Sequence, residues 1–128
     1  MTAVTESNVP IESLSQPEYE RGLDLLAASL PAEAATAFRA AIAADPANFD
    51  AHHGLVRALR DAGQLEQSIA AALALTALTP ADPLAHTALS ISLQTAGHVP
   101  QAEAAAARAR ILEWKIQLKT PPAEDSLR

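Results

Sequence analysis

Apolar residues along the chain form stripes with helical spacing, and short breaks that contain glycine or proline separate these stripes. In residues 52–59 the stripe falls at i, i+3, i+4 and i+7, and it stops at Gly63. A second stripe occupies residues 65–75 and stops before Pro80. This spacing predicts a pair of helices joined by a tight turn at the glycine.

The same pair of helices is repeated 34 residues further along the chain. Residues 86–93 copy the first stripe, Gly97 copies its stop, and residues 102–109 copy the second stripe. A more diverged copy, QPEYERGLDLLAASLPAEAATAFRAAIAADP, precedes both. The matching residues at this offset are Pro46 with Pro80, Ala51 with Ala85, His52 with His86, Leu55 with Leu89, Leu59 with Leu93, Ala62 with Ala96 and Gly63 with Gly97. An internal repeat of this length is typical of proteins that stack one supersecondary unit.

Residues that cap helices stand at the expected helix starts. Asn48 and Asp82 occupy equivalent places, and Pro83 follows Asp82 at the first helical position, where its missing N–H costs nothing. Ser15 and Glu18 have the S-x-x-E spacing of a capping box. The sequence therefore predicts a capped start for the first helix of each repeat.

Four positions of the repeat carry small, turn-forming or aromatic residues. They are Gly22, Val56 and Ser90 in the first helix, Ser29, Gly63 and Gly97 at the turn, Ala34, Ser68 and Ala102 early in the second helix, and Phe38, Ala72 and Ala106 later in it. Over about residues 15–113 this pattern resembles the tetratricopeptide repeat (TPR) family. The resemblance implies an all-α fold, a right-handed α-solenoid of three helix-turn-helix units. Ser29 must then adopt a left-handed backbone that glycine adopts more easily.

The repeats define the expected domain organisation. A TPR domain covers residues 15–119. Its repeats span about 15–48, 49–82 and 83–113. Because no proline follows the third copy before Pro121, its last helix is expected to continue to about Lys119 as a C-terminal cap. Residues 1–14 and 120–128 lack periodicity and are expected to be flexible terminal segments.

Composition favours a helical protein that is not exported. Hydrophobic residues make up 49% and aromatic ones only 3%, because about a quarter of the chain is alanine, the best helix former. No apolar run reaches the roughly 18 residues of a membrane helix, and the N-terminus lacks the features of a secretory signal. We therefore expect a soluble, cytoplasmic protein without membrane insertion. The net charge of -6 argues against a nucleic-acid partner.

The residue patterns of catalysis and cofactor binding are missing from the sequence. There is no cysteine, no glycine-rich phosphate loop and no G-x-S-x-G or H-E-x-x-H motif, which argues against an enzyme and against a bound cofactor. His52 and His53 are adjacent, hence about 100° apart on a helix, and His86 lies one repeat away. This spacing does not suit a metal site. We expect His52 and His86 to pack between helices and His53 to face solvent.

The resemblance also implies a binding surface, because the first helices of TPR units line an inner groove. The residues that would face it are Tyr19, Leu23, Leu26, His53, Arg57, Arg60, Thr87, Ile91 and Gln94. Arg57 and Arg60 suit a carboxylate of a partner, although a solvated face explains them equally well. The resemblance thus implies a non-catalytic adaptor or scaffold that binds a peptide segment of a partner protein. A small cytoplasmic chaperone for a secreted client is an alternative with the same fold.

The extended last helix offers a second surface for an oligomer contact or a cap. Its residues are Ile111, Trp114, Lys115 and Leu118. Trp114 either packs on the last repeat or forms an apolar patch that pairs with another molecule. Since the tail is basic and the front of the chain acidic, a structural alternative is self-assembly, in which the tail helix of one copy docks on the first repeat of the next.

Overall fold

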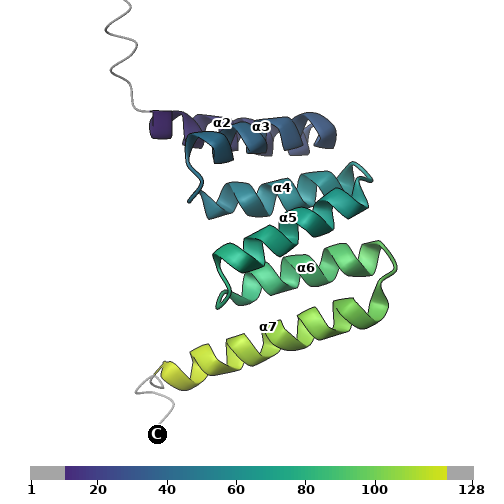
Figure 1. Ribbon diagram of the computed structural model, residues 1–128. Coiled ribbons are helices and arrows are strands. Elements are labelled where there is room, and N and C mark those ends of the chain that lie inside the picture. Colours follow the sequence, from purple (N-terminus) through teal and green to yellow (C-terminus); the bar gives the residue numbers. More distant parts are fainter. Residues whose placement is uncertain (1–10, 121–128) are drawn as a thin grey trace, which may run out of the picture.

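Six α-helices stack in sequence order over residues 11–120, the part of the chain that the computed structural model describes (Figure 1). The elements are η1 (Ile11–Leu14, a 3-10 helix), α2 (Ser15–Ala27), α3 (Pro31–Ala44), α4 (Phe49–Asp61), α5 (Leu65–Leu78), α6 (Pro83–Thr95) and α7 (Val99–Lys119). Helices α2 with α3, α4 with α5, and α6 with α7 form three pairs. The fold is the all-α solenoid that the 34-residue period predicts.

The structure describes part of each chain end that the sequence predicts to be flexible. Residues 1–10 and 121–128 of the expected flexible segments lie outside the described residues. Residues 11–14 form η1, which packs against α2 and α3. Helix α7 continues to Lys119, as the absence of a proline between the third copy and Pro121 predicts.

The turn inside each helix pair contains one residue with a left-handed backbone. The φ angle is 61° at Ser29, 78° at Gly63 and 87° at Gly97. The residue after each of them donates its backbone N–H to a carbonyl five residues earlier, as Gln64 does to Leu59 at 2.9 Å. Glycine adopts this conformation freely, whereas the Cβ of Ser29 makes it costly, as the sequence predicts.

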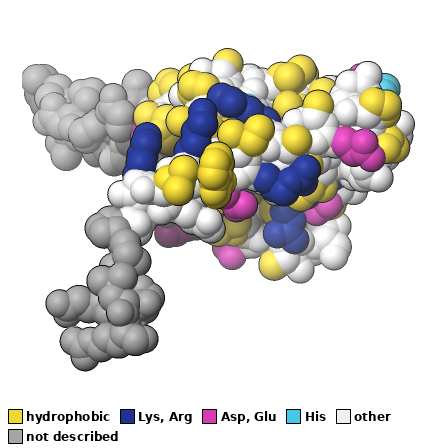
Figure 2. Space-filling view, turned by 90° about the horizontal axis from the view of Figure 1, so that it is seen from below, with side chains coloured by type: hydrophobic (Ala, Val, Ile, Leu, Met, Phe, Trp, Pro, Cys, Tyr) yellow, Lys and Arg dark blue, Asp and Glu magenta, His cyan; other side chains and the backbone are white. Residues whose placement is uncertain are grey.

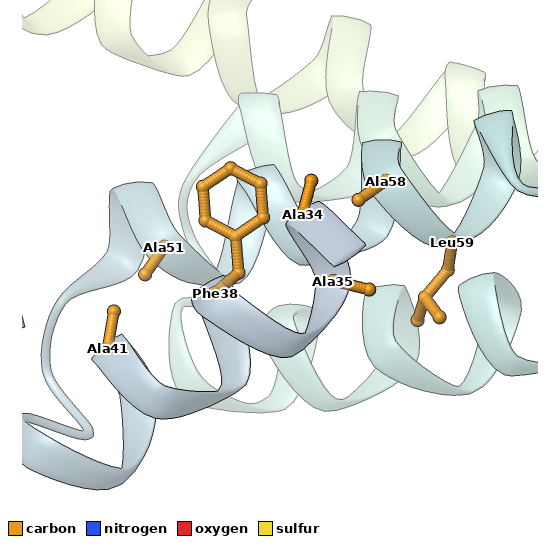
Figure 3. Close-up of a cluster of buried hydrophobic side chains, with 7 residues drawn as sticks. All are labelled: Ala34, Ala35, Phe38, Ala41, Ala51, Ala58 and Leu59. Atoms are coloured by element: carbon orange, nitrogen blue, oxygen red, sulfur yellow. The ribbon is translucent and has the colours of Figure 1, made fainter. Parts of the chain in front are cut away.

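The ring of Phe38 is the centre of the first hydrophobic cluster and is 0% exposed (Figure 3). Gly22 on α2 and Gly54 on α4 lie against this ring, and a Cβ added to them would come within 2.5 Å and 2.6 Å of its Cε1 atom. The other buried members of the cluster are Ala34, Ala35, Ala41, Ala51, Ala58 and Leu59. One large ring therefore fills the space that small residues leave open, and it joins α2, α3 and α4.

Buried serines connect the second repeat to the third. Ser68 on α5 donates its hydroxyl to the carbonyl of Val56 at 2.9 Å, and its Oγ lies 2.7 Å from the Oγ of Ser92 on α6. Since the Ser68 proton is directed to the carbonyl, Ser92 is the donor in the hydroxyl pair. In the third repeat, Ser90 donates to the Ala102 carbonyl at 2.8 Å, so a similar bridge recurs with the helices exchanged. These bonds satisfy polar groups inside an otherwise apolar core.

Asn48 and Asp82 cap their helices as predicted. The backbone N–H of Ala51 donates to Oδ1 of Asn48 at 3.1 Å, and that of Leu84 donates to Oδ1 of Asp82 at 3.0 Å. Pro83 stands in the first turn of α6. The starts of the second and third pairs are therefore fixed by side-chain caps.

The predicted capping box at Ser15 and Glu18 is wrong. Helix α2 already includes Ser15, and its start has no side-chain cap. The buried Ser15 hydroxyl instead donates to the carbonyl of Ala41 at 2.8 Å and accepts from Nδ2 of Asn48 at 2.9 Å. Ser15 therefore ties the start of α2 to the end of α3, a tertiary contact that local spacing does not reveal.

We expect Asn48→Ala to lower the free energy of unfolding by about 1–2 kcal/mol, and Asp82→Ala by about 1 kcal/mol. Both changes remove an N-cap, but only Asn48 also bonds to a buried hydroxyl. Urea unfolding followed by circular dichroism measures the difference. Equal losses for the two variants would show that the bond to Ser15 contributes nothing.

Both ends of the stack carry charge where the inner junctions carry small or apolar residues. Asp24 on α2 is exposed, whereas Ala58 and Ser92, one and two repeats later, are buried. At the other end Glu103 on α7 is exposed, whereas Ile69, one repeat earlier, is buried. At these two repeat positions, each end pair therefore carries a charge where an inner junction buries a small or apolar side chain.

Candidate functional site

The first helices of the three pairs, α2, α4 and α6, are neighbours along one side of the stack. An open hollow of about 300 Å³ between α4 and α6 is lined by Asp50, His53, Val56, Arg57, Arg60, Leu84, Thr87, Ala88 and Ile91. A second hollow of about 410 Å³ is lined by Leu26, Ser29, Pro31, Arg57 and Asp61. Because Arg57 borders both, the hollows adjoin. We call them together the inner groove.

Most of the residues predicted for a groove meet in these hollows. Those that line them are Leu26, His53, Arg57, Arg60, Thr87 and Ile91. Leu23 and Gln94 are exposed on α2 and α6 but border neither hollow. Tyr19 is half-buried because its ring packs on Phe38, with centroids 5.9 Å apart. Tyr19 therefore contributes to the core as well as to the surface.

Seven residues that line the inner groove were not predicted for it from the sequence: Ser29, Pro31, Asp50, Val56, Asp61, Leu84 and Ala88. Asp50 and Leu84 line the α4–α6 hollow, and Leu84 is among the most exposed large apolar side chains. Each stands three residues before a predicted groove residue, His53 or Thr87, and thus one turn earlier on the same stripe. Extending the stripe by one turn towards each helix start would have found Asp50 and Leu84.

Charges in the inner groove are concentrated on α4. Arg57 Nε lies 3.6 Å from Oδ2 of Asp61 on the same helix, an exposed pair that solvent screens. Arg60 forms no ion pair with any described residue. The sequence predicts that His53 faces solvent, but its side chain is only partly exposed. It lines the hollow, and its Nε2 lies 3.9 Å from Oδ2 of Asp82. The groove therefore offers a guanidinium without an acidic partner beside apolar side chains.

His52 and His86 bind the loops between repeats. Nε2 of His52 lies 2.9 Å from the carbonyl oxygen of Pro46, and Nε2 of His86 lies 2.9 Å from that of Pro80. A carbonyl oxygen accepts only, so Nε2 carries the proton in both rings. Each ring thus pins the loop before its helix. Within residues 11–120, no group of three or more His, Asp or Glu side chains is arranged to hold a metal ion.

The residues predicted for a second surface lie on the outside of α7. Trp114 is 60% exposed, and Ile111 and Leu118 are exposed as well. The residue of this segment that packs into the stack is Leu112, which is buried. Lys115 borders a separate hollow of about 320 Å³ beside the α5–α6 loop. In the described chain Trp114 is therefore a surface residue and does not pack on the last repeat.

Repeated helix pairs and a groove along their first helices define an α-solenoid of the kind that mediates protein interactions. A family model described as tetratricopeptide repeat matches residues 25–91, which is more than half of the chain. The chain belongs to the tetratricopeptide repeat family. No helix within the described residues is both long and apolar enough to span a membrane.

A solved structure, MamA MSR-1 C2, has a similar fold. The TM-score is 0.71 and the sequence identity is 21%, over 79% of this chain and 58% of that one. At this identity the likeness concerns the fold alone. The chain spans a little over half the length of this neighbour. Among curated proteins, no match is found.

Proposed function

We propose that this protein is a non-catalytic adaptor whose inner groove binds a short segment of a partner protein. The observation that carries the proposal is the α4–α6 hollow, where Arg60 has no ion-pair partner among the described residues and lies with Leu84 and Ile91 around one open space. A guanidinium without an internal partner is available for a carboxylate of a ligand.

The lining of the inner groove suits a partner segment with an acidic residue in the middle and apolar residues on either side. Arg57 and Arg60 lie on α4, at the centre of the three first helices. Leu26 stands on one side of them, and Leu84 and Ile91 stand on the other. An acidic residue flanked by leucine or isoleucine therefore matches the groove in both charge and polarity. Asp50 and Asp61 at the rim disfavour a strongly acidic run, which adds specificity.

We expect short peptides with one Glu between leucines or isoleucines to bind the protein better than the same peptides with Gln. The difference should be about tenfold, or about 1.4 kcal/mol, because the amide loses the charge-assisted bond. The double variant Arg57→Glu/Arg60→Glu should lose binding of the Glu peptides. Fluorescence anisotropy of a labelled peptide panel measures both effects.

A matched control separates the groove from a general effect of charge. Arg108→Glu/Arg110→Glu reverses the same number of charges on exposed positions of α7 and should leave peptide binding within about twofold of the parent protein. Circular dichroism verifies that both variants are folded. Equal loss of binding in both double variants, or equal binding of the Glu and Gln peptides, contradicts the proposal.

A further inference from the structure

Helix α7 is longer than the helix it pairs with and projects beyond it. It has 21 residues and α6 has 13. Figure 1 shows α7 continuing past the start of α6. At 1.5 Å per residue, the difference corresponds to about 12 Å, or about two turns. We call residues 111–119 of α7 the overhang.

Large apolar side chains cover the overhang on more than one side. Ile111, Trp114 and Leu118 form one stripe at i, i+3 and i+7 and are 45%, 60% and 66% exposed. Ile116 points about 200° away from Trp114 around the helix axis, and it is exposed too. Large apolar side chains exposed together ordinarily mark a surface that another molecule covers. Leu112 is the apolar residue of the overhang that packs into the stack, so the face with Ile111, Trp114 and Leu118 has no cover within the described chain.

An apolar hollow lies at the opposite end of the stack, on η1, α2 and α3. It has a volume of about 440 Å³, and its lining residues are Leu14, Pro17, Glu18, Ala40, Ala43 and Ala44. We call it the head hollow. Three of its walls are alanine side chains, which leave room for a large inserted side chain, and a tryptophan in a pocket of this kind often dominates an interface. The head hollow borders neither hollow of the inner groove.

The overhang and the head hollow lie in regions of opposite charge. Helix α7 carries the four bases Arg108, Arg110, Lys115 and Lys119 against two acids, and none of these bases forms an ion pair with a described residue. Figure 2, seen from the α7 end, shows basic side chains interleaved with hydrophobic ones. Residues 15–45 carry five acids against two bases, and one of these acids, Glu18, lines the head hollow. Two overhangs paired with each other would bring like charges together, whereas the two ends attract each other.

We propose that the overhang of one copy of this protein docks into the head hollow of a second copy, with Trp114 inserted between the alanines of α3. The two surfaces differ, so the contact is heterologous and extends head to tail into a ring or a filament. Few side chains take part, so the association is weak and depends on concentration. It leaves the inner groove free to bind a partner, and it therefore supplies several grooves in one assembly.

Sedimentation velocity over a concentration series tests this proposal with variants at each surface. Trp114→Glu and Leu118→Glu on the overhang, and Ala43→Glu in the head hollow, should each remain monomeric where the parent protein associates. All three positions are exposed, so the variants should fold. Ala77→Glu is the matched control, because Ala77 is exposed at the same repeat position as Ala43, one repeat later, and should associate like the parent.

Mixing two variants distinguishes head-to-tail docking from symmetric pairing. Ala43→Glu keeps its overhang and Trp114→Glu keeps its head hollow, so an equimolar mixture should form a complex of two chains and nothing larger. Raising the salt concentration should weaken the association, because it screens the opposite charges. A parent protein that is monomeric at all concentrations, an Ala43→Glu variant that still associates, or association that strengthens with salt would overturn the proposal.

Discussion

Replacing Phe38 with alanine is expected to lower the free energy of unfolding by about 3–5 kcal/mol. The ring is fully buried and touches two helices besides its own, so its removal leaves a cavity where α2, α3 and α4 meet. Domains of this size are stable by only about 5–15 kcal/mol, so the substitution removes at least about a fifth of the stability. Urea unfolding measures the loss, and hydrogen exchange should show it first in α2 and α3, because a solenoid repeat contacts only its neighbours.

Phe49 provides the matched control for Phe38. It is the other phenylalanine of the chain, but it is 40% exposed, so Phe49→Ala should cost about 1 kcal/mol or less. Similar losses for the two variants would contradict the central position of Phe38.

Gly54 gives an independent test of the same core. Gly54→Ala should destabilise the parent protein, because its Cβ would meet the Phe38 ring at 2.6 Å. The same change should stabilise Phe38→Ala by about 0.5–1 kcal/mol, since alanine is the better helix former once the ring is gone. If Gly54→Ala changed the free energy of unfolding in the same direction in the parent protein and in Phe38→Ala, the ring would not limit the space at Gly54.

Removing the Ser68 hydroxyl is expected to lower the free energy of unfolding by about 1–3 kcal/mol. The upper value corresponds to a change of about a hundredfold in the folding equilibrium constant. In Ser68→Ala the buried hydroxyl of Ser92 loses its acceptor, and the Val56 carbonyl loses a donor. Ser92→Ala should cost less, because Ser68 continues to donate to Val56. The two serines are therefore expected to contribute unequally.

The double variant Ser68→Ala/Ser92→Ala should be more stable than Ser68→Ala alone. It restores no hydrogen bond, but it leaves no buried hydroxyl without a partner. The first junction supplies the precedent, because Ala34 and Ala58 occupy the equivalent positions there and both are fully buried. Urea unfolding of the three variants completes a double-mutant cycle. Strictly additive losses would contradict the inferred donor and acceptor roles.

The repeat period allowed most of the fold to be predicted. Residues suited to one kind of backbone position mark the helix boundaries: Gly63 and Gly97 stand at left-handed turns, and Asn48 and Asp82 cap helix starts. No proline interrupts α7 before Lys119, so this helix continues to that residue. Each of these signals acts within a few residues, so the sequence alone reveals it.

Contacts between repeats were harder to predict. Ser15 fits a local capping motif, but the structure places its hydroxyl against Ala41 and Asn48, which lie in distant parts of the chain. Gly54 is not at a conventional small position of the repeat, and only the packing of Phe38 explains it. Such partners depend on how helices meet, and spacing along one helix carries no information about that.

The surface features likewise fall into those that local spacing predicted and those that depend on how the helices pack. Helical periodicity predicted the stripe that contains Arg57, Arg60 and Ile91, because residues on one face follow from spacing. It did not predict that Tyr19 turns to the ring of Phe38, nor that a hollow with alanine walls lies at the far end from Trp114. These features arise from helices brought together by the fold.

Site-specific photocrosslinking in cells that naturally produce the protein tests the central claim most directly. A photoreactive residue at Ile91 reports on the inner groove, and one at Leu73 on α5 reports on a surface outside it; the two positions are 44% and 53% exposed. The adaptor function predicts a crosslinked partner from Ile91 that is lost with Arg57→Glu/Arg60→Glu and is not obtained from Leu73. The same crosslinks from both positions, or a product from Ile91 that survives the arginine changes, would contradict it.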